Sequence, residues 1–155
     1  MMDRTLLVAG FLILCAGLAG AQSAEPVNIF FANPRLEVSA QAAHDSASFP
    51  VGVFPVRRMV DHYLPMRGSM MELLHGPSPS EADSGYASDL QGLYLRRFAI
   101  HRGTALVSLR GDLHLGGALA GARLRAQVER TLRQFARIRR VTLLINGRKD
   151  FDAMK

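Results

Sequence analysis

The sequence predicts a small α+β domain: a mixed β-sheet of about four to five strands with two helices packed on one face, in the order β-β-α-β-β-α-β. Three observations lead to this prediction, namely short runs of β-branched and aromatic residues, a hairpin signal, and one strongly amphipathic helix near the C-terminus. The chain has 155 residues, of which 48% are hydrophobic and 21% are charged. That length and composition suit a single globular domain with one core.

The first 21 residues have the pattern of an export signal. Arg4 precedes an apolar run from Leu6 to Leu18, and small residues follow as far as Ala21, after which we expect cleavage. The only cysteine, Cys15, lies within this run, so the mature protein needs no disulfide. We therefore expect an exported, periplasmic or otherwise extracytoplasmic protein, attached to a membrane only through an uncleaved signal.

Three segments precede the first strongly predicted helix. Residues 27–32 are β-branched and aromatic and stop at Asn33-Pro34, which predicts a first strand. Residues 36–48 are rich in alanine, serine and polar residues and predict a weakly ordered loop or an extended hairpin. Residues 49–60 again favour β structure, but two prolines restrict this strand to the edge of a sheet.

A helix is predicted to begin at Pro65 and to stop at Gly76-Pro77, because proline suits the first helical turn and glycine suits the end. Its apolar residues share one face, and they are Met66, Met70, Leu73 and Leu74. The stretch 78–89 has turn-forming residues and no periodicity, so we expect a surface loop there.

Residues 93–100 and 104–109 are predicted to pair as a hairpin. Arg102-Gly103 between them supplies the positive φ angles that a tight turn needs. The second strand alternates, so one of its faces is expected to be buried.

The strongest helix lies within residues 116–137. Its apolar arc holds Leu124, Val128, Thr131, Leu132 and Phe135. Alternating residues from Val141 to Ile145 predict a last strand that ends at Asn146-Gly147. We therefore expect a domain over residues 27–149 and a flexible tail over 150–155.

Several of these segments, in this order, resemble the GerMN (sporulation and spore germination) family. The stretch from Leu73 to Pro77 is similar to the Leu-Leu-x-Gly-Pro helix end of that family. The helix and strand near the C-terminus are similar to its Thr-Leu-x-x-Phe and Val-x-x-x-Asn-Gly motifs. The matching residues are Leu73, Leu74, Gly76, Pro77, Thr131, Leu132, Phe135, Asn146 and Gly147.

The resemblance implies an extracytoplasmic domain without enzymatic activity, in a family whose members occur in sporulation and germination proteins. One position differs from the family pattern. Relatives commonly carry Val-Asp-(Leu or Phe)-Ser on the second hairpin strand, whereas this chain has Ser108 and Arg110 there. The local charge is thus reversed.

The chain is basic, with 19 Lys and Arg against 13 Asp and Glu and a formal net charge of +6. Many of the arginines lie on the outer side of the last helix, namely Arg123, Arg125, Arg130, Arg133 and Arg137, and Arg139 and Arg140 follow. Two interpretations are open: a solvated face, or a docking surface for an envelope protein, an anionic wall polymer or further copies of the domain. Nucleic acid is disfavoured, because export removes the chain from it.

No pattern in the sequence identifies an active site or a cofactor site. The pair Glu72 and His75 has helical spacing for two ligands, but a di-metal site would need a second such pair. No Gly-x-Ser-x-Gly turn occurs. We expect no catalytic residues, no metal and no cofactor, and therefore a non-catalytic envelope module that acts by binding. The alternative is a cell-wall-active enzyme or its direct regulator.

Overall fold

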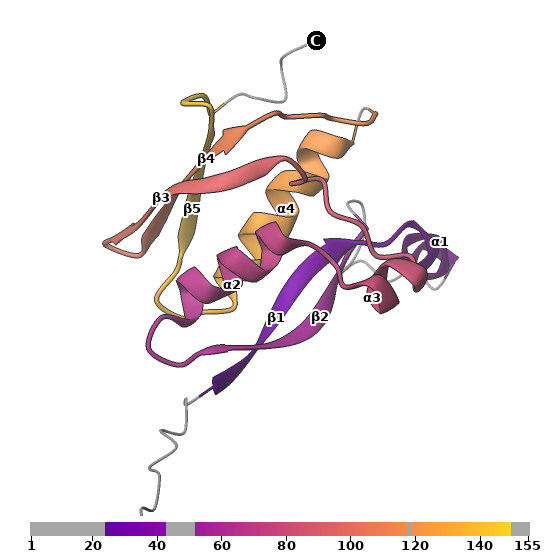
Figure 1. Cartoon of the computed structure of the whole chain (residues 1–155), viewed down its shortest axis with the longest axis horizontal. Coiled ribbons are helices and arrows are strands. Elements are labelled where there is room, and N and C mark those ends of the chain that lie inside the picture. Colours follow the sequence, from indigo (N-terminus) through magenta and orange to yellow (C-terminus); the bar gives the residue numbers. More distant parts are fainter. Residues whose placement is uncertain (1–23, 43–51, 118, 150–155) are drawn as a thin grey trace, which may run out of the picture.

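The computed structural model describes residues 24–42, 52–117 and 119–149 (Figure 1). The strands are β1 (Ala24–Ala32), β2 (Val53–Asp61), β3 (Leu93–His101), β4 (Thr104–Gly111) and β5 (Arg140–Ile145). The helices are α1 (Pro34–Ala42), α2 (Pro65–His75), α3 (Pro79–Asp83) and α4 (Ala120–Arg133). The α+β class is confirmed.

The strands form two sheets, so the prediction of a single mixed sheet is wrong. β1 and β2 form an antiparallel two-stranded sheet, and β3, β4 and β5 form a three-stranded sheet in that order. Which strands pair is decided by contacts between distant parts of the chain, and strand patterns alone carry no information on them.

The predicted hairpin is confirmed. β3 and β4 pair antiparallel, and the turn residues Arg102 and Gly103 have φ angles of 46° and 77°. β5 returns parallel to β4 after α4, which is the crossover connection that a parallel pair requires. The three-stranded sheet is therefore mixed, as the sequence indicated.

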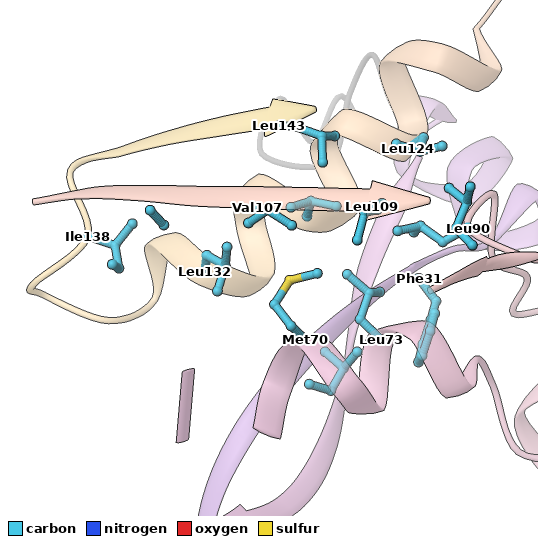
Figure 2. Close-up of a cluster of buried hydrophobic side chains, with 14 of the residues drawn as sticks. Phe31, Met70, Leu73, Leu90, Val107, Leu109, Leu124, Leu132, Ile138 and Leu143 are labelled. Carbon is cyan, nitrogen blue, oxygen red and sulfur yellow. The ribbon is translucent and has the colours of Figure 1, made fainter. Parts of the chain in front are cut away.

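Helices α2 and α4 lie between the two sheets and pack against each other (Figure 1). α4 contacts β1 on one side and β5 on the other, and α2 contacts β1 and β3. In the core close-up, side chains from both sheets meet those of the two helices (Figure 2). The residues labelled there are Phe31, Met70, Leu73, Leu90, Val107, Leu109, Leu124, Leu132, Ile138 and Leu143. The helices lie between the two sheets and join them through one core.

A loop or extended hairpin is predicted over residues 36–48, but α1 extends over residues 34–42, and residues 43–48 lie outside the described residues. Asn33 explains the difference. Its side-chain oxygen accepts hydrogen bonds from the backbone N–H groups of Arg35 and Leu36, at 3.1 Å each, and Pro34 occupies the first helical position. A capped, short and largely exposed helix forms here without an apolar stripe.

The predicted loop over residues 78–89 contains the short helix α3. Ser78 and Glu81 form a reciprocal capping box: the Ser78 hydroxyl accepts from the Glu81 N–H, and the Glu81 carboxylate accepts from the Ser78 N–H at 2.7 Å. These two bonds satisfy donors that would otherwise be unpaired at the start of the helix.

The strongest predicted helix is confirmed, because α4 covers residues 120–133, within the expected range 116–137. Beyond it, Phe135 and Ile138 continue in a tight turn that leads into β5. The expected export signal and flexible tail lie outside the described residues. No helix among the described residues is both long enough and apolar enough to span a bilayer.

Candidate functional site

The free edge of β1 is closed by side chains of α4. The Thr131 hydroxyl accepts a hydrogen bond from the Phe30 N–H at 3.1 Å. The Gln134 side chain accepts from the Asn28 N–H at 2.9 Å and donates to the Asn28 carbonyl at 2.7 Å. Thr131 of α4 and Gln134 at its C-terminal end thus supply the hydrogen bonds that a neighbouring strand would otherwise make along this edge.

The two ends of the same edge are closed as well. Ala32 exchanges two backbone hydrogen bonds with Ala87, at 2.9 and 2.8 Å. Pro26 lies an even number of residues before Asn28, Phe30 and Ala32, so its backbone nitrogen faces the same edge, and proline has no N–H to leave unpaired there. Along residues 26–32, every N–H that faces away from β2 is therefore bonded or missing.

The candidate arginines of the last helix separate into groups with different surroundings. Arg123 forms a two-point ion pair with Asp89, with Nε–Oδ2 and Nη2–Oδ1 distances of 3.1 and 3.2 Å. The buried Gln127 side chain donates to the same carboxylate at 2.8 Å. The hydrogen bonds that Arg123 donates to Asp89 raise the pKa of Arg123 above its usual value. Arg123 thus ties α4 to the segment before β3.

Arg125 and Arg130 also bond to backbone carbonyls. Arg125 donates to Lys149 at 3.3 Å, and Arg130 donates to Val53 at 3.2 Å. Both side chains are half-buried. Arg130 therefore helps to hold the start of β2 against α4.

A second group of arginines is exposed at the end of α4 and in the segment leading to β5. We call Arg133, Arg137, Arg139 and Arg140 the C-terminal basic surface. Three of them border an open hollow of about 470 Å³ between α4 and β5. We call it the β5 hollow, and it is lined by Thr104, Glu129, Arg133, Arg139, Arg140, Val141 and Thr142. Glu129 is the single carboxylate in this lining, so the local charge is positive.

A second hollow, of about 500 Å³, lies on the β1 side of α4. Its lining includes Phe30, Arg130 and Gln134, and it shares Glu129 and Arg133 with the β5 hollow. The end of α4 therefore separates two depressions, and Arg133 borders both of them.

The family-motif residues at the end of α2 occupy structural positions. Leu73 is fully buried, and Leu74 packs half-buried against the core. Gly76 has a φ of 83° and terminates α2, and Pro77 follows immediately before the cap of α3. Gly76 combines this positive φ with a ψ of −177°, a backbone conformation that glycine adopts without the steric cost of a Cβ.

The motif residues near the C-terminus join α4 and β5 to other elements. Thr131 and Leu132 are buried, and Phe135 packs against the core. Asn146 exchanges two hydrogen bonds between its side chain and the Gly111 backbone, at 3.2 and 2.9 Å. Gly147, with a φ of 85°, completes the turn after β5. Asn146 thereby extends the pairing of β4 and β5 by one position.

Glu72 and His75 approach at 3.7 Å on α2, and Arg58 of β2 also reaches Glu72 at 3.5 Å. Arg58 pairs more closely with Glu81, with two hydrogen bonds of 2.7 and 2.6 Å. Within residues 24–42, 52–117 and 119–149, no group of three or more His, Cys, Asp or Glu gathers as a metal site. The two carboxylates surround a guanidinium and link α2 and α3 to β2.

Sequence reasoning missed Asp89, Gln127 and Gln134. A signal for Gln127 was present, because it lies four residues before Thr131 on the face of the helix that holds the apolar arc. A polar residue on a core-facing position needs a buried partner. Asp89 and Gln134 carry no such signal, since their partners are distant in the sequence.

Comparison with one solved structure supports the fold, and two others show weaker similarity. The chain is similar to the tandem GerMN domains of the sporulation protein GerM from Bacillus subtilis, with a TM-score of 0.55 and 15% identity over 86% of this chain and 43% of that one. A proposed lipoprotein from Clostridium perfringens gives a TM-score of 0.46 and 16% identity, over 92% and 82% of the two chains. The first GerMN domain of GerM gives 0.44 and 20%, over 61% and 74%.

The chain spans less than half the length of the tandem-domain structure that it matches. No curated protein shows significant similarity to it. A family model described as Germane, sporulation and spore germination, matches residues 29–150, which is most of the chain. This match confirms the resemblance seen in the motifs, and the chain therefore belongs to the Germane family of sporulation and spore germination domains.

Proposed function

We propose that this protein is an exported, non-catalytic module of the cell envelope that holds an anionic partner at the C-terminal basic surface. The observation that carries the proposal is the difference between the two groups of arginines. Arg123 and Arg130 bond to groups within the fold, whereas Arg133, Arg137, Arg139 and Arg140 are exposed. Arg133, Arg139 and Arg140 also border a hollow with one carboxylate.

Exposed charge of one sign attracts and orients a partner of the opposite sign over roughly 8 Å at physiological ionic strength. The chain as a whole has a net charge of +6, which adds to this attraction. Residues 1–21 have the export pattern, so the partner is sought among envelope proteins and anionic wall polymers.

The proposal is tested by the retention of the mature chain, residues 22–155, on washed envelopes of the producing organism. The variant Arg133→Gln/Arg137→Gln/Arg139→Gln removes three charges from the basic surface. The variant Arg57→Gln/Arg96→Gln/Arg97→Gln removes three exposed charges from other strands and serves as a control with the same net charge.

We expect the first variant to lose about tenfold in affinity, a change of about 1.4 kcal/mol, and the control to lose much less. Binding of the original protein should weaken with added salt. Equal losses in the two variants would show that only the net charge matters, and the docking surface would then be abandoned.

The claim that the protein is non-catalytic is tested separately. Purified peptidoglycan is incubated with the mature chain, and released fragments are measured. We expect no cleavage. Release of fragments that disappears on substituting Glu129→Gln, the carboxylate of the hollows, would instead identify a wall-active enzyme.

A further inference from the structure

The backbone of β5 has one edge paired with β4 and one edge free. In a parallel pair, consecutive residues direct their N–H and C=O groups to opposite edges. Arg140 donates to Gly103 at 3.1 Å and Asn146 donates to Leu109 at 3.0 Å, both toward the β4 side. Thr142 and Leu144 lie at every second position between these two residues, so their backbone N–H and C=O groups also point toward β4. Residues 141, 143 and 145 therefore face the free edge.

The far end of this free edge is closed by the following turn. Ile145 donates to the Arg148 carbonyl at 2.9 Å, and Arg148 donates back to Ile145 at 3.0 Å. Val141 and Leu143 remain. Within the described part of the chain no strand pairs with β5 on this side, because β5 is the last strand of its sheet. Two residues thus offer adjacent donors and acceptors along one line.

The other free edges are protected in ways that β5 lacks. Thr131, Gln134 and Ala87 close the edge of β1. Pro55 removes one N–H from β2, and an irregularity between Leu95 and Arg97 interrupts β3. Prolines and bulges are common means of preventing unwanted strand pairing. β5 is regular in its pairing with β4 from Arg140 to Ile145.

The side chains around the open edge of β5 favour a negatively charged partner. Arg133, Arg139 and Arg140 line the β5 hollow beside Val141 and Thr142. A strand added here would project alternate side chains to the two faces of the sheet. Its carboxylates would come close to three guanidinium groups and to one carboxylate, Glu129.

We infer that the free edge of β5 binds an extended, acidic segment of a partner protein, which adds as a fourth strand beside Val141 and Leu143. The inference rests on the proposed function and names the kind of partner that the basic surface would hold. Addition of a strand to an open sheet edge is an established form of peptide recognition, with affinity from backbone hydrogen bonds and specificity from alternate side chains.

Two other occupants fit the same observations less well. A second copy paired through β5 would bring two C-terminal basic surfaces together, and like charges repel. A polyanion without amide groups would satisfy the arginines but not the alternating N–H and C=O groups of Val141 and Leu143. An acidic peptide satisfies both.

The test uses a labelled eight-residue peptide in which valine and glutamate alternate, with binding to the mature chain followed by fluorescence anisotropy. Two further peptides are N-methylated, one at the valines and the other at the glutamates. A fourth peptide has lysine in place of glutamate. Because alternate N–H groups of an added strand face β5, one methylated set should block pairing and the other should not.

We expect one of the two methylated peptides to lose at least about tenfold in affinity, the other to bind like the parent, and the lysine peptide to bind far more weakly. Equal binding by all three acidic peptides would overturn strand addition while leaving a charge-driven basic surface in place. No binding of the parent peptide up to about 1 mM would also overturn the inference.

A variant of the protein provides a second measurement. Val141→Pro removes the N–H that faces the free edge and leaves the hydrogen bonds to β4, and proline is tolerated at such edge positions. Val141→Ala is the matched control for lost packing, since Val141 is half-buried against the core. We expect Val141→Pro to bind the parent peptide at least about fivefold more weakly than Val141→Ala, and equal binding would count against the edge.

Discussion

The free edges of β1 and β5 lie on either side of the same helix and are treated in opposite ways. On the β1 side, Thr131 and Gln134 bond to the backbone of Phe30 and Asn28. On the β5 side, α4 contributes Glu129 and Arg133 to the wall of an open hollow that Val141 also lines. One helix closes one edge and leaves the other accessible.

The difference distinguishes an edge that is closed to protect the fold from an edge that stays accessible to a partner. An unpaired edge strand is prone to unwanted pairing, so the capping of β1 protects the domain. The edge of β5, which is regular in its pairing with β4, lies beside the exposed residues Arg133, Arg139 and Arg140. The contrast makes the β5 side the place to look for a partner, and the following changes test it.

The largest loss in the free energy of unfolding is expected from Thr131→Val. The change keeps the shape of the side chain but removes the acceptor for the Phe30 N–H, which is partly buried. Leaving a buried donor unpaired costs about 1–3 kcal/mol, to be measured as a loss in the free energy of unfolding in urea. Thr142→Val on β5 is the control, with an expected change within about 0.5 kcal/mol. Equal losses would remove the distinction between the edges.

The next largest effect is expected from Arg123→Gln, which breaks the ion pair with Asp89. Both side chains are only partly exposed, 25% and 14%. We expect a loss of about 1–2 kcal/mol, less than for a fully buried pair. The folded state raises the pKa of Arg123, so its stabilisation is complete below the unfolded pKa and is lost only as pH rises through the folded one. Between about pH 6 and pH 9 the loss should therefore be constant.

A smaller effect is expected from Gln134→Ala, because its hydrogen bonds to Asn28 are exposed to solvent. We expect the free energy of unfolding to fall by about 0.5–1.5 kcal/mol. The local effect should be clearer: hydrogen exchange of the Asn28 amide should accelerate more than that of Phe30, whose acceptor is retained. An unchanged Asn28 rate would mean that Gln134 does not protect the edge.

The smallest effect on stability is expected from Arg133→Gln, which lies on the exposed surface at the end of α4. The unfolding free energy should change by less than about 0.5 kcal/mol. Binding to envelopes should nevertheless weaken, because this side chain borders both hollows. A loss of stability comparable to that of Arg123→Gln would contradict the division of the arginines into two groups.

Local signals in the sequence predicted the hairpin turn at Arg102-Gly103, the ends of α2 and the buried stripe of α4. These features depend on residues close together along the chain. Even α3 had a readable signal, since Ser78 and Glu81 have the spacing of a capping box. The turn-forming residues of this segment and its lack of apolar periodicity nevertheless predict a loop.

Long-range pairing could not be predicted in the same way. The pattern of residues 27–32 predicts a strand, but it does not show that β1 pairs with β2 alone or that α4 closes its other edge. Likewise, a helical projection places Arg123 and Arg133 on one outer side. Only the structure shows that Asp89 meets Arg123 while Arg133 stays exposed.

Hydrogen exchange of single amides in the unbound protein tests the contrast between the edges most directly. The Asn28 and Phe30 amides are bonded to α4 and its end, whereas the Val141 and Leu143 amides face the free edge of β5. We predict slow exchange for the first pair and much faster exchange for the second, although Leu143 has a buried side chain. Equal protection of all four amides would contradict an open β5 edge.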